Sequence, residues 1–390
     1  MPWKEVTMEK ERERFVKMVQ EKRGSISSLC REFGIARTTG YKWLERYESE
    51  KSLKNHSRAP LHRPLKTPAI VEDNIIAYRK RYPDIGALKI REMMETERYE
   101  NLPSAKTFNN IFNRHHLISK EASQAATPCN RFEKAYPNEM WQADFKGNFA
   151  LKDGNRCHPL NIIDDHSRFN LCCDAHLSET FEDIQPSMIR IFQEYGLPDT
   201  LLCDNGNPWG TSQSTGFTRF EVWLMELRVL TIHGRIKHPQ TQGKEERFNG
   251  SFKREYLKHH EFENQYDAQR GFDEYRDFYN NKRPHHALNL KTPASRYHSS
   301  ERKYPERIET WEYSSEYTVH RIKSTGFLTL KGQGYFLSEA FGGKEIAIRE
   351  SGLLGQYTLV YRDFKIARID PDNRVFTMKK AHRIKGDPRD

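Results

Sequence analysis

The stretch between residues 139 and 257 constrains the fold most, because strand and helix patterns alternate along it in a single order. Apolar–polar alternation predicts strands, and an apolar period of 3.6 residues predicts helices. Turn and helix-stop signals separate the elements. The order predicts an α/β core of the RNase H-like type with a mixed sheet. In chain order, the expected elements are strands 141–151, 159–164 and 169–175, helix 179–195, strand 200–203, helix 220–227, strand 228–233 and helix 241–257.

Three acidic residues fall on separate elements of this core. Asp144 lies in the first strand, Asp204 follows the short strand T-L-L-C, and Glu246 lies in the last helix. Phosphodiester transfer needs an activated attacking oxygen and a stabilised leaving oxygen, and two divalent cations about 3.5–4 Å apart can provide both. Mg²⁺ binds a few carboxylates together with water and phosphate. These acids are therefore the predicted ligands of two Mg²⁺ ions, for which Mn²⁺ could substitute.

Other acids in this stretch have a structural interpretation. The chain contains 54 Asp and Glu residues, so most of them must be solvated surface charges. Asp164 and Asp165 close a strand and are expected to cap the turn into Ser167-Arg168. Glu182 and Asp183 are expected to be helix-start charges, which the helix dipole favours.

Three blocks carry the acids of interest: W-Q-A-D-F-K-G, C-D-N-G-N-P-W and H-P-Q-T-Q-G-K-E-E-R-F-N. They resemble, in the same order, the blocks of bacterial insertion-sequence transposases with an integrase-type Asp-Asp-Glu core. Residues 279–297 resemble the segment that follows them in that family. An ordered set of motifs is much more specific than a lone D-N-G. The resemblance implies a DNA transposase whose catalytic and metal-binding residues are Asp144, Asp204 and Glu246.

The third acid has a close neighbour of the same type. The family pattern Q-G-x-x-E-x-x-N places its glutamate on Glu246 and its asparagine on Asn249, which favours Glu246 over Glu245. The residue before the third acid is usually apolar in this family, whereas this chain has Glu245 there. Residues of the core expected to position DNA strands are Lys146, Asn205, Lys244, Arg247 and Asn249.

Residues 1–50 are predicted to form a helix-turn-helix DNA-binding domain. The tight turn is Gly34-Ile35-Ala36, and the following helix should continue to about Tyr47, with Tyr41 and Leu44 facing the core. The N-terminal part of such a helix reads base edges in the major groove. The alternative is a three-helix interaction module with solvated basic residues. The residues expected to face DNA are Arg37, Thr38, Thr39, Lys42 and Arg46.

A basic, proline-rich linker is expected at residues 51–68, where Arg58, Arg63 and Lys66 could lie along phosphates or in a minor groove. A solvated spacer is the alternative. Residues 69–119 look like a second helix-turn-helix domain, followed by a linker at 120–138. The residues that would point outward toward DNA there are Lys106, Asn109, Asn110 and Arg114.

The catalytic core is expected to span residues 139–300. Residues 282–286, K-R-P-H-H, are basic enough to touch substrate. Residues 305–390 change character and are predicted to form a C-terminal small β-barrel domain, with Gly or Asp turns between its strands. The expected strands are 317–322, 326–330, 334–337, 345–348, 356–361 and 365–369. This domain is expected to bind DNA or another protomer.

Composition agrees with a polyanionic partner, since the net charge is +10 and the pI is about 9.1. The six cysteines include no C-x-x-C and no zinc spacing, which indicates a reducing compartment. Cys172 and Cys173 are adjacent in a strand, so they should point to opposite faces as packing residues. No apolar run has membrane length, and M-P-W-K-E-V is not a signal peptide. The expected location is the bacterial cytoplasm, near the nucleoid.

Taken together, the sequence predicts a transposase that binds the terminal inverted repeats of its element in double-stranded DNA. Water would hydrolyse a strand at the transposon end, and the exposed 3′-OH would then attack target DNA. Joining two ends requires a homo-oligomer on DNA. Two alternatives remain: a catalytically inactive, transposase-derived DNA-binding regulator, and an RNase H-class nuclease without strand transfer.

Overall fold

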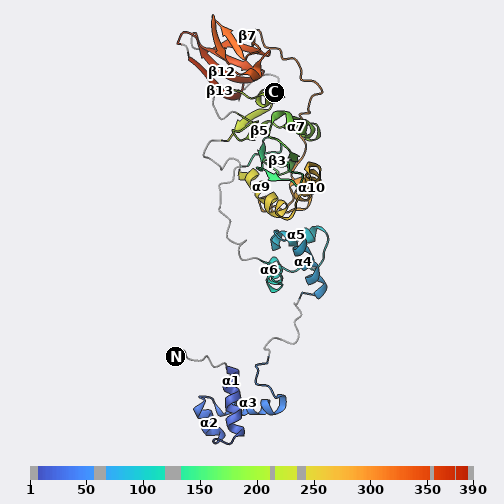
Figure 1. Ribbon diagram of the computed structural model, residues 1–390, viewed down its shortest axis with the longest axis vertical. Coiled ribbons are helices and arrows are strands. Elements are labelled where there is room, and N and C mark those ends of the chain that lie inside the picture. The colour runs from blue at the N-terminus through green and yellow to red at the C-terminus, as the bar shows by residue number, and fades with distance from the viewer. Residues whose placement is uncertain are drawn as a thin grey trace. The chain divides into compact units, whose positions relative to one another are not determined.

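The computed structural model describes residues 8–56, 67–118, 133–210, 216–234, 243–351, 355–373 and 375–384 (Figure 1). The chain divides into two compact units, Met1–Lys66 and Thr67–Asp390. Within the described residues, we find no helix whose length and apolar character would let it traverse a bilayer.

The first unit contains three helices, α1 (Met8–Gln20), α2 (Ile26–Glu32) and α3 (Arg37–Glu50). Ser25 caps α2, because its side chain accepts a hydrogen bond from the Ser28 backbone N–H at 3.2 Å. Gly34 has a φ of +63°, which suits the turn between α2 and α3. The three helices enclose a small apolar core made of Phe15, Val16, Leu29, Cys30 and Leu53, with Trp43, Leu44 and Tyr47 packed against it.

The rotational setting of α3 differs in one respect from the sequence-based expectation. Leu44 packs on the core as expected, but Tyr41 is 55% exposed. Gly40 takes the inward position instead, and a Cβ there would lie 2.5 Å from Cys30 Sγ. The helix therefore approaches the core through a glycine, and Tyr41 joins its outer face.

The second unit begins with α4 (Ala69–Arg81), α5 (Ala87–Thr96) and α6 (Ala105–Arg114). The Ser104 side chain caps α6 by accepting from the Thr107 backbone N–H at 3.4 Å. The apolar face of α6 packs against α4 and α5, which gives this three-helix module a core of its own. That core includes Ile75, Ile90, Met93, Met94, Phe108, Ile111 and Phe112.

A mixed sheet forms the centre of the second unit, as predicted. Its strands are ordered β4-β3-β1-β5-β6, and short β2 (Phe149–Ala150) pairs with the beginning of β3. The pairs β3–β4 and β1–β3 are antiparallel, whereas β1–β5 and β5–β6 are parallel. This arrangement is the RNase H-like order. The strand bounds are β1 (Trp141–Phe145), β3 (Arg156–Asp164), β4 (Asn170–His176), β5 (Thr200–Cys203) and β6 (Leu230–His233).

Helices cover both faces of this sheet. On one face α7 (Phe181–Tyr195) and α8 (Arg219–Glu226) pack in a core with Trp141 and Cys172. On the other face α9 (Gly243–Glu255) and α10 (Gln265–Asp277) pack in a core with Cys173. Cys172 and Cys173 are both buried and do lie on opposite faces, which confirms their interpretation as packing residues.

The basic segment after α10 is buried at Arg283 and His285, whereas Lys282 and His286 are exposed. Beyond a π-helical turn (Phe278–Lys282), Arg283 is buried and donates to both carboxylate oxygens of Glu255 on α9, at 2.7 and 2.6 Å. His285 is also buried. Asn280 makes two 2.8 Å hydrogen bonds with the backbone of Asn170 in β4 and so supports that strand's beginning.

The C-terminal region is built of antiparallel strands in two separate sheets. One sheet has the order β13-β12-β11-β10-β7, and the other is the hairpin β8–β9. Among the described strands, no pairing joins β13 to β7, so the predicted closed barrel is not confirmed. The last strand was not expected from sequence. The bounds are β7 (Thr318–Arg321), β8 (Phe327–Leu330), β9 (Gln333–Phe336), β10 (Glu345–Glu350), β11 (Tyr357–Tyr361), β12 (Phe364–Asp370) and β13 (Val375–Arg383).

Candidate active site

Two of the three acids singled out in the sequence lie side by side on neighbouring strands. β1 and β5 are parallel, with Trp141 opposite Leu201 and Gln142 opposite Leu202. Continuing this register by two residues brings Asp144 opposite Asp204, just beyond the end of β5. Asp144 is partly buried and Asp204 is exposed. The carboxyl ends of parallel strands are where open α/β sheets place their sites.

The backbone of Asp204 is held by β6 and α8. Its carbonyl oxygen and the Nδ1 of His233 form a 2.7 Å hydrogen bond, and the Nε2 of His233 lies 2.8 Å from Glu221 Oε1. The Asp204 carboxylate accepts from the Gly206 backbone N–H at 2.9 Å. Sequence reasoning missed His233 and Glu221, and their polar side chains within apolar segments were the available signal.

Asp144 is oriented by a chain of two asparagines. The Nδ2 of Asn249 on α9 donates to Asp144 Oδ2 at 3.1 Å, and the Nδ2 of Asn161 on β3 donates to Asn249 Oδ1 at 2.7 Å. Asn161 is fully buried opposite Asp144 in the β1–β3 pairing. Sequence analysis named Asn249 but missed Asn161, which is detectable as a polar residue within a buried apolar strand.

The electrostatic environment of Asp144 disfavours its negative charge. Burial raises the pKa of Asp144 to about 7, and the nearby carboxylate of Asp204 acts in the same direction. The backbone N–H of Phe145 and the charge of Lys146 lower that pKa only in part. A cation at this position would relieve the repulsion between the two carboxylates.

Asp144→Asn should therefore stabilise the metal-free protein at neutral pH. Asp144 binds its proton more tightly in the folded chain, where its pKa is about 7, than in the unfolded chain, where the ordinary aspartate pKa is 3.8, so its ionisation lowers stability as pH rises between those values. The gain in unfolding free energy should grow through that window and level off above pH 7. Its size, discounted for partial exposure, is on the order of 3 kcal/mol.

Urea unfolding of the metal-free protein at a series of pH values measures this gain. Asp153→Asn, in the exposed turn before β3, is the matched control and should change stability by less than about 0.5 kcal/mol. An Asp144→Asn effect that does not change between pH 5 and pH 8 would contradict the expected electrostatic environment.

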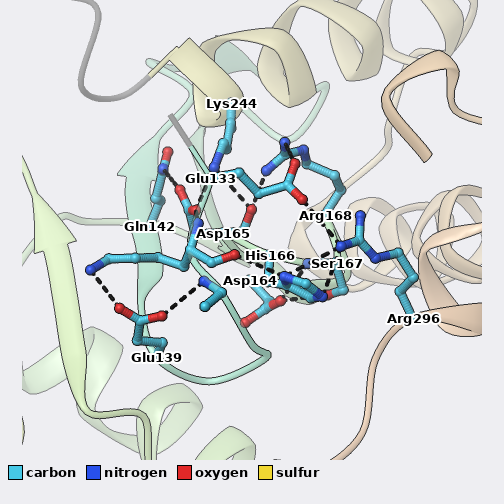
Figure 2. Close-up of polar contacts among 12 residues, drawn as sticks. Glu133, Glu139, Gln142, Asp164, Asp165, His166, Ser167, Arg168, Lys244 and Arg296 are labelled. Carbon is cyan, nitrogen blue, oxygen red and sulfur yellow. Dashed lines mark hydrogen bonds and ion pairs between the residues drawn. The ribbon is translucent and has the colours of Figure 1, made fainter. Parts of the chain in front are cut away.

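The start of α9 is fixed by a buried ion pair, shown in Figure 2. Lys244 pairs with the carboxylate of Asp165, which is fully buried at the β3–β4 turn, and its Nζ also donates to the Asp165 backbone oxygen at 3.0 Å. Gln142 donates to the same carboxylate at 2.7 Å. Lys244 was expected to position DNA, but the structure engages it inside the core. Asp164 caps the turn as expected, accepting from the Ser167 N–H at 2.7 Å.

The two candidate glutamates of α9 point in different directions. Glu245 is 1% exposed, whereas Glu246 is exposed. Burial raises the pKa of Glu245 well above its usual range, and the charges of Asp144 and then Glu246 raise it further. The buried glutamate is thus the one that faces Asp144 in this structure.

The donor set suits a hard divalent cation, although it is not closed around one. Within the described parts of the chain, no three His, Cys, Asp or Glu side chains are near enough to one another to hold a metal ion. Carboxylate oxygens of Asp144, Asp204 and α9 are nevertheless the ligand type that Mg²⁺ and Mn²⁺ prefer. The oxygens of Glu245 lack a hydrogen-bond partner in the described chain, as expected of ligand atoms without their ion.

Apart from Lys244 and Asn249, described above, the predicted DNA-contact residues fall into three groups. Asn205 donates to the Gly234 backbone oxygen at 2.8 Å, and Arg46 donates to Glu50 at 3.2 Å with only 14% of its side chain exposed, so these two make internal contacts. Arg114 pairs with Glu72 but keeps 57% of its side chain exposed, so it belongs with the exposed residues. Arg58, Arg63 and Lys66 lie outside the described residues. The exposed residues are Arg37, Thr38, Lys42, Lys106, Asn109, Asn110 and Arg247, while Thr39 and Lys146 are partly exposed.

A hollow of about 790 Å³ lies beside the candidate site, between β2 and the C-terminal half of α9. Apolar side chains in its lining include Phe149, Leu151 and Phe262. The lining is also rich in positively charged side chains. Lys146 belongs to the lining and follows Asp144 by two residues in the chain, so the hollow lies next to the candidate site. The basic residues of the lining are Lys146, Lys152, Lys253, Arg254, Lys258 and His260.

Comparison with protein families gives four matches along the chain. Residues 134–239 and residues 227–293 match two integrase core domain families. Residues 11–60 match a helix-turn-helix domain, and residues 317–375 match the C-terminal domain of IS481 family transposases. The integrase-core matches together contain Asp144, Asp204 and both glutamates.

Two curated proteins are similar to parts of the chain. The insertion element IS407 uncharacterized 31.7 kDa protein of Burkholderia multivorans is 29% identical over 160 residues, covering 40% of this chain and 54% of that protein. The insertion element IS476 uncharacterized 39.2 kDa protein of Xanthomonas euvesicatoria is 24% identical over 247 residues, covering 60% of this chain and 66% of that protein. The chain thus spans about half to two thirds of the length of these relatives.

Among solved structures, the catalytic core domain of HTLV-2 integrase in complex with magnesium matches at 16% identity and a TM-score of 0.32, covering 42% of this chain and 99% of that one. A simian T-cell lymphotropic virus intasome in complex with a PP2A regulatory subunit matches at 15% identity and a TM-score of 0.36, covering 67% of this chain and 89% of the matched chain. At such scores, the fold assignment rests on the strand order and on the family matches.

Proposed function

We propose that this chain, which belongs with the bacterial insertion-sequence transposases that carry an integrase-type core, is a DNA transposase that cuts and joins DNA strands. It would bind the terminal inverted repeats of its element and transfer their 3′ ends to target DNA. The observation that carries this proposal is the register of β1 and β5, which brings Asp144 and Asp204 together beside the acidic start of α9.

Asp144, Asp204 and Glu246 are the proposed catalytic ligands of two divalent cations, Mg²⁺ or Mn²⁺. Bound there, the cations would polarise the attacking oxygen and stabilise the leaving one. The chain's own contribution is positional. Asn249 holds the Asp144 carboxylate, and His233 holds the backbone of Asp204.

DNA would lie against the basic surfaces. Lys146 and Lys253 in the hollow beside Asp144 carry charges that could offset those of a phosphodiester backbone close to the reacting bond. Arg247, exposed on α9, is proposed to act in the same way. The C-terminal strands are proposed to contact DNA or a second protomer, and joining two ends at once requires a homo-oligomer.

The first three-helix domain is proposed to read the terminal repeat. The outer face of α3 presents Arg37, Thr38, Tyr41 and Lys42 near its N-terminus, the part of such a helix that enters the major groove. Exposed Lys106, Asn109 and Asn110 on α6 give the second module a similar polar face. Affinity would come largely from phosphate contacts, and specificity from contacts with base edges.

Lys42→Ala should weaken binding of a terminal-repeat duplex and make the binding less dependent on salt. If Lys42 neutralises one phosphate, the slope of log K against log[salt] should become shallower by about 0.9. Fluorescence anisotropy between about 50 and 200 mM salt measures this slope. Lys17→Ala, an exposed lysine on α1, is the matched control and should leave the slope unchanged. Equal slopes for the wild type and Lys42→Ala would remove α3 from the proposed interface.

A labelled duplex carrying the terminal repeat of the element, incubated with target plasmid and Mg²⁺ or Mn²⁺, tests the proposed function. The proposal predicts labelled DNA joined to the plasmid. Binding without cleavage would instead indicate a transposase-derived regulator. Cleavage without joining, with no preference for the repeat, would indicate a nuclease.

A further inference from the structure

Glu245 is a buried carboxyl group for which the described residues provide no hydrogen-bond partner. It is 1% exposed, and neither carboxylate oxygen has a hydrogen-bond partner among the described residues. Buried polar groups in proteins are nearly always hydrogen-bonded, and buried charges are paired or bind metals. The position therefore calls for either a permanently neutral acid or a cation.

The groups around Glu245 carry an excess of negative charge. Asp144 is the charged group with the largest effect on it, followed by Glu246, and both raise its pKa. Lys146 and the Asn249 side chain act in the opposite direction. The Asn249 amide, whose Nδ2 donates to Asp144 Oδ2, lies close enough to lower the pKa of Glu245, but no hydrogen bond of normal geometry joins it to either Glu245 oxygen. Asp144 and Glu245 are thus two nearby acids whose negative charges disfavour each other, and Lys146 offsets this in part.

The rotational setting of α9 keeps Glu245 in this position. Phe248 and Phe252 are buried in the core on the α9 face of the sheet, and Asn249 is 6% exposed. Residues three and four apart lie on the same side of a helix, so Glu245 continues this inward stripe. The buried Lys244–Asp165 pair anchors the preceding residue to the β3–β4 turn (Figure 2). Turning Glu245 outward would require breaking these contacts.

We propose that Glu245 is itself a ligand of the divalent-metal site. The site would then contain four carboxylates, those of Asp144, Asp204, Glu245 and Glu246. This inference rests on the metal site of the proposed function and adds a ligand to it. A hard cation bound by Asp144 and Glu245 would satisfy the Glu245 oxygens, which have no hydrogen-bond partner among the described residues.

Calcium titration of the full chain without DNA tests this inference apart from catalysis. Isothermal titration calorimetry should show Ca²⁺ affinity falling by at least about tenfold in Glu245→Gln, since even residues behind the ligands contribute about 10–100-fold. Glu245→Val, which cannot bind a cation, should lose at least as much affinity. The valine variant should also melt at a higher temperature than wild type without metal, because it removes an unpartnered buried acid.

Two further outcomes separate the inference from the proposed function. If wild type binds Ca²⁺ and the valine variant folds and binds it within about twofold of wild-type affinity, Glu245 is only a buried neutral acid and the inference fails alone. If wild type binds neither Ca²⁺ nor Mn²⁺, the metal site itself fails, and the proposed function fails with it. Glu246→Gln in the same titration shows whether both glutamates contribute.

Discussion

Asp144→Asn and Asp204→Asn should each lower the rate of DNA strand joining by about 10³-fold while terminal-repeat binding persists. A divalent ion contributes several kcal/mol of charge stabilisation in the transition state, and about 4 kcal/mol corresponds to about 10³-fold in rate. The amide keeps the shape of the carboxylate but not its charge, so the metal is held weakly. The proposed DNA-reading face lies on α3, in the separate first unit, and is untouched.

Gel quantification of joined product, with anisotropy for binding, measures the two effects separately. Asp153→Asn, the exposed turn residue used above, is the matched control and should join DNA at the wild-type rate. Joining at a rate within about tenfold of wild type in either active-site variant would remove that residue from the catalytic set, because a metal ligand contributes more than 1.4 kcal/mol.

The largest effect on stability is expected from breaking the ion pair between Arg283 and Glu255. Both side chains are nearly buried, at 6% and 4% exposure, and the guanidinium donates to both carboxylate oxygens. Among the described residues, Arg283→Met leaves Glu255 with the more exposed Arg254, at 3.4 Å, and the nearby charge of Lys89 as cationic neighbours. An uncompensated buried charge of this kind costs about 3–5 kcal/mol, and the loss should lie near the lower figure because Arg254 remains.

Chemical denaturation at pH 7 gives the free energy of unfolding for this comparison. The double variant Arg283→Met/Glu255→Leu serves as its control, since replacing a whole buried pair with apolar groups is often neutral or stabilising. Stability should therefore recover in the double variant. If the double variant is as unstable as Arg283→Met, the loss comes from packing and not from the stranded carboxylate.

Local sequence patterns were sufficient to predict the order of elements in the core. Strand patterns identified β1, β3 and β4. The 3.6-residue period identified α7 to α9, because each of these helices buries one side against the sheet. Cys172 and Cys173 illustrate this, since strand periodicity alone placed them on opposite faces. Asp144 and Asp204 were found because strand ends and motif order are both visible locally.

Contacts between distant residues could not be predicted in the same way. Lys244 belongs to a basic, polar block and was expected to meet DNA, but its partner Asp165 lies 79 residues earlier. Arg283 was likewise grouped with basic residues expected to touch substrate, whereas its side chain is buried and paired with Glu255. Whether a charge faces solvent or a buried partner depends on tertiary packing. The same holds for Glu245, whose burial depends on how α9 rests on the sheet.

Local sequence patterns also do not predict how a helix is rotated about its own axis or whether a sheet closes into a barrel. Tyr41 has an apolar ring and was assigned to the core, but close packing of α3 required Gly40 there. The C-terminal strands were recognised individually, apart from β13. Their pairing into an open five-stranded sheet and a separate hairpin depends on which strand edges meet.

The proposed acidic centre at Asp144 and Asp204 would join DNA by attack of a 3′-OH. This is tested with a pre-cut terminal-repeat duplex with a free 3′-OH, compared with the same duplex ending in a 3′-deoxy nucleotide, in Mg²⁺ or in EDTA. We expect joined plasmid product only with the 3′-OH end and only with Mg²⁺. Equal product from the 3′-deoxy end, product in EDTA, or no product in any condition would contradict it.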